Sequence, residues 1–391
     1  MHQRRGMGEV YRARDTKLDR DVAIKVPHRS RSPEIRNGTL KMERGQAMRF
    51  NRYALAAEAV ADLLVLTVVL LLPFSANAQT RESGPWWPSP HGPVDQAGAS
   101  NYVTPQKILE ALQIPQSGQT YELGHPYEAS MPQYTSRPYY LNVVPAAPAT
   151  SEGRNTVHGD YFTGYIGQMG TQFDALSHQG RTVEMADGSF KSVFYNGFTE
   201  EELTGGNRGQ GRVEALGVEQ MKPFITRGIL VDIAAYKGLD TLGPRYEVTM
   251  EDVRGALGRQ GMSEDTIEQG DAVLFHYGWS VNWTNPSKYN DSRFGVGENE
   301  GSPGIGSEVA RWLVTRKVAM VGADSCCVQI MPPTGSDNVH HILFFAEGIP
   351  LLENMELKDV ARDQVYEFLF LNLTLPIKGA TGSPVRPIAV R

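Results

Sequence analysis

Cysteine is almost absent from this chain of 391 residues. The only two, Cys326 and Cys327, are adjacent, which excludes a framework of several disulfides. The pair is typical of small residues at the end of a buried strand, and a strained vicinal disulfide is the alternative. Neither cysteine has a second cysteine at a metal-ligand spacing.

An excess of positive charge is also missing. Lys and Arg number 38 against 44 Asp and Glu, and the formal charge of -6 gives no electrostatic reason to expect a nucleic-acid partner. No Gly-x-Gly-x-x-Gly follows an expected strand after residue 79, so a nucleotide cofactor is not expected. What is present, 40% apolar residues over this length, suffices for one large or two ordinary domains.

Residues 1–40 carry a short kinase-like pattern. Gly6 and Gly8, followed by Val22-Ala23-Ile24-Lys25, resemble the Gly-rich loop and the lysine strand of a serine/threonine kinase. No His-Arg-Asp catalytic loop and no Asp-Phe-Gly follow, so a protein kinase is excluded. We interpret the segment as a non-functional remnant or as an over-extended gene model.

Residues 41–78 have the pattern of a secretory signal peptide that starts internally. Arg49 and Arg52 precede an apolar stretch over 63–72, and Ala76-Asn77-Ala78 supplies a cleavage pattern. The apolar stretch is shorter than the ~20 residues that a membrane-spanning helix needs. We therefore expect cleavage before residue 79, no stable membrane span afterwards, and a periplasmic or secreted protein.

Residues 79–391 alternate between strand and helix patterns, which predicts one α/β domain. Thr104-Pro105 and Thr249 begin expected helices, as a cap followed by proline and as a capping box respectively, and another helix begins at Ser307. Expected strands cover residues 139–144, 160–169, 228–233, 271–276, 318–321 and 366–375. His276 lies among apolar residues and is interpreted as a hydrogen-bonded core histidine.

The most informative run is residues 167–178. Gln168, Gln172, Asp174 and His178 are separated by even offsets, so an extended strand would place all four on one face. Gly170 would allow another backbone or a ligand to approach closely. The alternatives are that Asp174 caps a turn and that His178 is a core histidine.

This run resembles the signature of the metal-dependent cyclase/kynurenine formamidase family, His-x-Gly-Thr-His-x-Asp-x-x-x-His. It matches at Gly170, Thr171, Asp174 and His178, while Gln168 and Gln172 replace the first two histidines. The stretches 226–232, 270–276, 322–324 and 379–387 are also similar to the family. His341 precedes Glu353 by twelve residues, which is the separation of the family's later metal-binding histidine and glutamate.

The resemblance implies the family's layered α/β fold, with a swivelling-domain-like β/β/α core, in an oligomer. It implies a divalent ion, Mn²⁺, Zn²⁺ or Mg²⁺, held by Gln168, Gln172, Asp174, His341 and Glu353. His340 is the competing ligand, and the spacing favours His341. The two carboxamides should favour oxygen-liking ions over zinc. His178, together with Asp174, is expected to carry the catalysis.

The function implied is metal-assisted hydrolysis of a C–N bond in a small formyl or cyclic amide. N-formylkynurenine, an intermediate of tryptophan breakdown, is the family's type substrate. His178 titrates near neutrality when unperturbed, so it can both take and return a proton. A lactone or ester hydrolase, and a non-catalytic periplasmic binder of small molecules on the same scaffold, are the alternatives.

Overall fold

The structure, a computed structural model, describes residues 9–15, 20–26, 84–132, 137–145, 157–207, 211–289, 300–334 and 338–391. The chain divides into two compact units, Met1–Ala76 and Asn77–Arg391. In the first unit, β1 (Glu9–Asp15) pairs antiparallel with β2 (Arg20–Val26). The rest of the kinase-like segment and the expected signal region, 41–78, lie outside the described residues. No helix among the described residues is long and apolar enough to cross a membrane.

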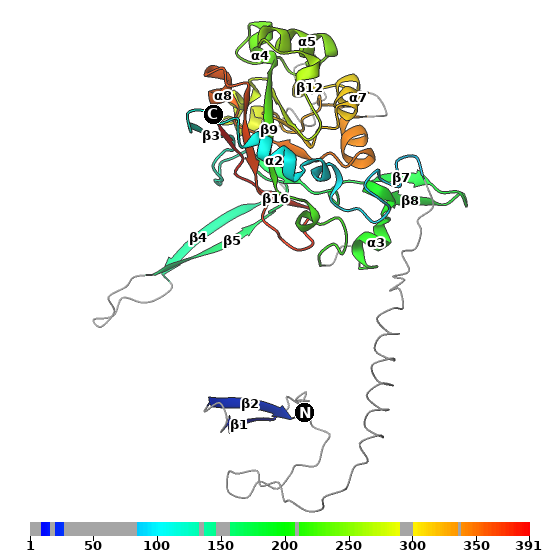
Figure 1. Ribbon diagram of the computed structural model, residues 1–391, viewed down its shortest axis with the longest axis vertical. Coiled ribbons are helices and arrows are strands. Elements are labelled where there is room, and N and C mark those ends of the chain that lie inside the picture. The colour runs from blue at the N-terminus through cyan, green and yellow to red at the C-terminus, as the bar shows by residue number, and fades with distance from the viewer. Residues whose placement is uncertain are drawn as a thin grey trace, which may run out of the picture. The chain divides into compact units, whose positions relative to one another are not determined.

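A nine-stranded mixed sheet forms the centre of the second unit (Figure 1). Its four inner strands are parallel, and the strands outside them pair antiparallel. The inner strands are β14 (Leu351–Glu353), β13 (Met320–Ala323), β11 (Ala272–His276) and β9 (Phe224–Asp232). In spatial order the strands are β16 (Gly382–Pro384), β6 (Gln172–Asp174), β14 (Leu351–Glu353), β13 (Met320–Ala323), β11 (Ala272–His276), β9 (Phe224–Asp232), β15 (Glu367–Asn372), β17 (Ile388–Val390) and β3 (Thr120–Glu122).

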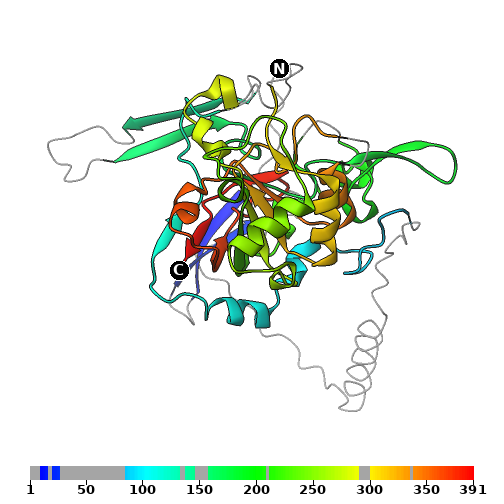
Figure 2. The same ribbon diagram turned by 90° about the horizontal axis from the view of Figure 1, so that it is seen from above.

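The helices begin where local capping signals predict them. Thr104 accepts a hydrogen bond from the Lys107 N–H at the start of α2, and Thr249 forms a capping box with Asp252 at the start of α5. Helices α4 and α5 contact each other and the inner strands β11 and β9 (Figure 2). The helices are α2 (Pro105–Ala111), α3 (Glu200–Thr204), α4 (Ile233–Lys237), α5 (Met250–Arg259), α7 (Ser307–Thr315), α8 (Lys358–Arg362), a π-helix η6 (His340–Ala346), and short 3₁₀ turns at Gly98–Tyr102, Tyr195–Gly197, Val218–Gln220, Glu264–Thr266 and Trp279–Asn282.

Three two-stranded ribbons complete the described part of this unit: β4 (Tyr139–Pro145) with β5 (His158–Gly164), β7 (Arg181–Glu184) with β8 (Phe190–Val193), and β10 (Glu247–Val248) with β12 (Gly304–Ile305). The β4–β5 hairpin projects away from the sheet in both views (Figures 1 and 2). Its large apolar side chains are exposed, with Tyr140 at 66% and Tyr161 at 69%.

The α/β class predicted from the sequence is confirmed. Most expected strands lie within a few residues of the observed ones. The strand expected over 160–169 ends at Gly164, and the one expected over 366–375 ends at Asn372. The inner strands β11 and β13 are buried almost throughout, which explains their continuous apolar sequence.

Candidate active site

Polar side chains gather at one edge of the sheet. Because β9, β11, β13 and β14 are parallel, their carboxyl ends meet at this edge, and α/β proteins commonly bind ligands there. Asp232, His276 and Glu353 are the last residues of β9, β11 and β14. Strand β6 runs antiparallel to β14, so its first residue, Gln172, lies at the same edge.

Gln172 and Glu353 form a cross-strand pair. Their Cα atoms are partners in the β6–β14 register, so the side chains share one face. The Gln172 amide nitrogen donates a hydrogen bond of 2.8 Å to Glu353 Oε2, and both residues are buried. The Gln172 carbonyl oxygen, Oε1, is buried and has no hydrogen-bond donor. The pair therefore presents an unused acceptor beside a carboxylate.

The expectation that residues 168–178 form one extended strand is wrong. Only Gln172–Asp174 is strand, because Gly170 has a φ of +57° and a Cβ there would lie 2.9 Å from the Tyr127 ring. The Gln168 amide donates to the Thr381 carbonyl (3.0 Å), so Gln168 does not line the cavity as predicted. The group that approaches Gly170 closely is the Tyr127 side chain, and not the backbone or ligand that the sequence suggested.

A turn after β6 brings His178 back to Asp174. The His178 N–H donates to the Ala175 carbonyl (2.8 Å), and His178 Nε2 lies 3.8 Å from Asp174 Oδ2. The two side chains thus meet through a turn instead of through strand alternation. Burial is the main cause that lowers the pKa of the His178 imidazole to about 3, and electrostatic interactions with His340 and Arg137 contribute to the same shift. His178 is therefore neutral at neutral pH.

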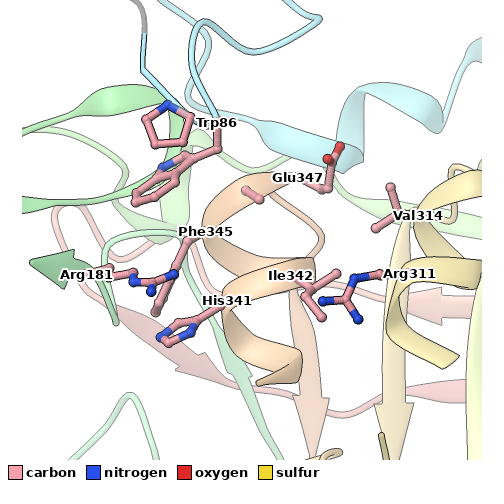
Figure 3. Close-up of a pocket in the computed structure, with 10 residues that line it drawn as sticks. Trp86, Arg181, Arg311, Val314, His341, Ile342, Phe345 and Glu347 are labelled. Atoms are coloured by element: carbon pink, nitrogen blue, oxygen red, sulfur yellow. The ribbon is translucent and has the colours of Figure 1, made fainter. Parts of the chain in front are cut away.

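The structure places His340, and not the preferred His341, in this pocket. His340 and His341 begin the π-helix η6 and point to different sides of it. His340 Nε2 lies 3.6 Å from Glu353 Oε1, whereas His341 packs on Phe345 with ring centroids 5.1 Å apart. Figure 3 shows His341 with Phe345 and Arg181 in a separate pocket of about 280 Å³.

Gln329 orients His340. The Gln329 side-chain oxygen lies 2.9 Å from His340 Nδ1 and accepts a hydrogen bond from it. Nδ1 therefore carries a proton, and Nε2 faces Glu353. Sequence spacing gave no signal for Gln329, because the contact joins a loop after β13 to η6.

The side chains converge on a cavity of about 160 Å³. Arg137 lies at its wall, where one guanidinium nitrogen donates to the Gln168 carbonyl (2.9 Å) and the guanidinium carbon lies 4.9 Å from the centre of the Tyr165 ring. No motif in the sequence marks Arg137 as a site residue. The lining residues are Arg137, Gln172, Asp174, His178, Gln179, Cys326, Cys327, Gln329, Met331, Asn338, His340 and Glu353.

The donor chemistry of this cavity fits a hard divalent ion. It offers the carboxylates of Asp174 and Glu353, the Nε2 lone pair of His340 and the orphaned oxygen of Gln172. Within the described ranges, however, no three His, Cys, Asp or Glu side chains form a compact group that could hold a metal. The expected ligands thus line one cavity, apart from Gln168 and His341, without forming a closed ligand set.

A second polar cluster lies further along the same edge. His276 Nδ1 is 2.8 Å from Asp232 Oδ1, and His276 Nε2 is 3.9 Å from Asp324 Oδ2. Burial disfavours the imidazolium, but the hydrogen bond to Asp232 and the charge of Asp324 outweigh it and raise the pKa of His276. His276 is therefore a hydrogen-bonded, largely buried histidine at the end of β11.

Comparisons with known proteins agree with this fold. The family model described as Cyclase matches residues 121–329. The crystal structure of a novel cyclase is 30% identical, with a TM-score of 0.65, and the alignment covers 77% of this chain and 98% of that chain. Isatin hydrolase A from Ralstonia solanacearum is 19% identical, with a TM-score of 0.49 and coverage of 70% and 92%. Isatin hydrolase A from Labrenzia aggregata, bound to benzyl benzoate, is 19% identical, with a TM-score of 0.46 and coverage of 73% and 97%.

No curated protein matches the chain. The family match nevertheless spans more than half of the 391 residues, and the solved cyclase is covered over almost its whole length. Four strands of the nine-stranded sheet, β6, β9, β11 and β13, lie within the residues that the family model matches. These strands carry much of the cavity edge. The chain belongs to the cyclase family.

Proposed function

We propose that this chain is a hydrolase that cleaves the C–N bond of a small formyl or cyclic amide. One observation carries the proposal: the Asp174–His178 pair and the His340–Glu353 pair converge on the same cavity. A neutral imidazole beside a carboxylate can take a proton from water and return it to a leaving nitrogen. A surface or purely structural role would not gather these groups around a cavity.

His178 acts as the general base in this proposal. Its pKa of about 3 makes the imidazole a weak base, so the imidazolium needs a partner during the reaction. Asp174, now 3.8 Å away, supplies that charge, since catalytic hydrogen bonds commonly shorten once substrate binds. His178 then donates the same proton to the leaving nitrogen as the C–N bond breaks.

Arg137 is proposed to stabilise the oxygen of the reacting carbonyl. Its guanidinium is the only Lys or Arg side chain among the described residues that line the cavity. Positive charge placed where negative charge develops in the transition state lowers the barrier. Small acyl groups suit a cavity of about 160 Å³.

A divalent ion, Mn²⁺, Zn²⁺ or Mg²⁺, is proposed at Asp174, His340, Glu353 and the Gln172 oxygen. When bound, such an ion would polarise the carbonyl and lower the pKa of water. N-formylkynurenine is a formyl amide and is therefore one compound for the assay. Its use there does not assign this protein a role in tryptophan breakdown.

The test is a substrate screen of the full chain with formamides, cyclic amides and lactones, alongside elemental analysis for metals. We expect amide hydrolysis, and we expect His178→Ala to reduce kcat by about 10²–10⁴-fold, the usual contribution of a general acid/base. Unchanged activity in His178→Ala would remove His178 from the mechanism. Turnover of lactones alone would favour an esterase, and binding without turnover would favour the non-catalytic alternative.

Export and self-association are further proposals. Residues 41–78 support cleavage of a signal peptide and a periplasmic or secreted location, which N-terminal sequencing of the exported protein tests. The exposed apolar side chains of the β4–β5 hairpin support a homo-oligomer, because an isolated hairpin is marginally stable in water. Light scattering of wild type against Leu141→Asp tests this. The kinase-like interpretation of residues 1–40 stays a prediction.

A further inference from the structure

The two cysteines of the chain meet inside the wall of the candidate active site. The sulfur atoms of Cys326 and Cys327 lie 2.7 Å apart, and both side chains line the same cavity as Asp174 and His178. Cys326 is buried and Cys327 is partly exposed. A small reagent that enters the cavity therefore reaches two sulfurs that are already in contact.

An unusual backbone brings these sulfurs together. Neighbouring side chains of a strand point to opposite faces, but Cys326 and Cys327 follow the end of β13 at Ala323. Val328 has a φ of +57°, and the Gln329 N–H donates to the Cys327 carbonyl two residues before it. Positive φ is an outlier for a β-branched residue, so the surrounding structure holds this turn in place.

We propose that Cys326 and Cys327 form a reversible vicinal disulfide in the cavity wall when the protein reacts with hydrogen peroxide. One cysteine, as its thiolate, attacks a peroxide oxygen, the O–O bond breaks, and a sulfenic acid forms as the first water leaves. The second sulfur then attacks the sulfenic sulfur, the S–O bond breaks, and the second water leaves. Together the two thiols lose two electrons and two protons, and these reduce one hydrogen peroxide to two waters.

The position of the sulfurs favours this bond, and the backbone keeps it reversible. A disulfide is about 2.05 Å long, so the sulfurs need to approach by only roughly 0.7 Å from their present 2.7 Å. Adjacent Cα atoms, however, are about 3.8 Å apart, which is shorter than in ordinary disulfides. Strained disulfides have more oxidising potentials and are reduced readily by small thiols.

Closing the bond would change the active site through Gln329. The Cys327 carbonyl accepts the Gln329 N–H, and the Gln329 side chain fixes the proton on His340 Nδ1. A ring between residues 326 and 327 must reorient the carbonyls of that turn. The effect on hydrolysis rests on the proposed function, whereas formation of the disulfide does not.

The experiment treats the reduced full chain with hydrogen peroxide and follows it by thiol titration, intact mass and non-reducing peptide mapping. We expect both thiols to disappear with the loss of two hydrogen atoms, within one chain, and to return on treatment with dithiothreitol. Because the chain has no other cysteine, any disulfide within one chain must be this one. Oxygen addition to the cysteines without an S–S link, or a disulfide between chains, would overturn the proposal.

Cys327→Ser is the matched control. Cys326→Ser is tested beside it, because either cysteine can be the one that attacks the peroxide. In the variant that keeps the attacking cysteine, the sulfenic acid has no neighbouring thiol, so a dimedone probe should label it far more than it labels wild type. Labelling at the wild-type level in both variants would overturn the proposal. If the disulfide forms and hydrolysis continues unchanged, the proposed effect on the active site through Gln329 is wrong, but the proposed disulfide is confirmed. If no substrate is turned over in either redox state, the proposed function fails and the mass measurement still decides the disulfide.

Discussion

Two histidine clusters lie along one sheet edge and differ in how closely their partners approach. The core cluster is Asp232, His276 and Asp324, and the pocket cluster is Asp174, His178, His340 and Glu353. In the core cluster, the shortest histidine–carboxylate distance is the 2.8 Å hydrogen bond of His276. In the pocket cluster, the distances are 3.8 Å at His178 and 3.6 Å at His340.

The pKa shifts separate the clusters in the same way. The pKa of His276 is raised, although burial opposes the charge, because carboxylates compensate it. Burial lowers the pKa of His178 to about 3, and no described contact closer than 3.8 Å to a carboxylate offsets it. A cluster that already satisfies its charges stabilises the fold, whereas one with its partners held apart keeps room for water, an ion or a substrate.

The largest expected effect is on activity at His340. His340→Ala should lower kcat/KM by about 10²–10⁴-fold, because it removes the imidazole that faces Glu353. His341→Ala is the matched control, since that side chain lines the other pocket, and its kcat/KM should stay near wild type. Steady-state kinetics of both variants is the measurement. If His341→Ala were the inactive variant, His341 and not His340 would be the histidine of the active site.

The core cluster should show its effect in stability. His276→Ala leaves two buried carboxylates without their shared cation and should lower the free energy of unfolding by about 3–5 kcal/mol. Urea denaturation measures this, and kcat/KM of the folded fraction should change little. A variant that keeps its stability but loses turnover would move His276 into the catalytic group.

Gln329 should have a smaller effect, as a positioning residue. Gln329→Ala removes the acceptor for His340 Nδ1–H and should reduce kcat by about 10–100-fold, as loss of an outer partner usually does. Gln329→Glu keeps an acceptor and should recover part of the loss. The comparison requires kcat and KM separately, and equal losses in both variants would argue against an orienting role.

The pH dependence of stability is the smallest expected effect. A raised pKa means that folded His276, which faces Asp232, Asp324 and Glu356, holds its proton more tightly than the unfolded chain does. This stabilisation is complete below the unfolded pKa of about 6.5 and is lost as pH rises through the folded pKa. The difference in urea midpoint between wild type and His276→Gln should therefore shrink from pH 6 to pH 9. A difference that grows over this range would contradict the raised pKa.

Local signals in the sequence predicted the fold well. Caps at Thr104 and Thr249 and apolar runs such as residues 271–276 depend on neighbours in the chain, so they can be read without the fold. The alternation of side chains along a strand, with its period of two residues, correctly placed Gln172 and Asp174 in one strand and on one cavity. It failed at Gln168 and His178, because Gly170 and the turn after Asp174 interrupt the strand.

The rest of the site depends on contacts between distant segments. Twelve residues separate Glu353 from His341, but η6 is a π-helix, and its first two side chains point to different pockets. Sequence spacing cannot choose between adjacent histidines in such a turn. Arg137 and Gln329 reach the cavity from a segment before β4 and a loop after β13, and nothing local marks either one.

Because β6 lies between β14 and β16 in the sheet, the C-terminal segment protects a strand that lines the cavity. Strand β16 (Gly382–Pro384) covers β6 on the side away from β14, and Thr381 beside it accepts the Gln168 amide. Proteolytic trimming before residue 381 would strip β6 of that cover and expose its free hydrogen-bonding groups to another polypeptide. Loss of residues 381–391 would then appear first as aggregation, ahead of any selective defect in turnover.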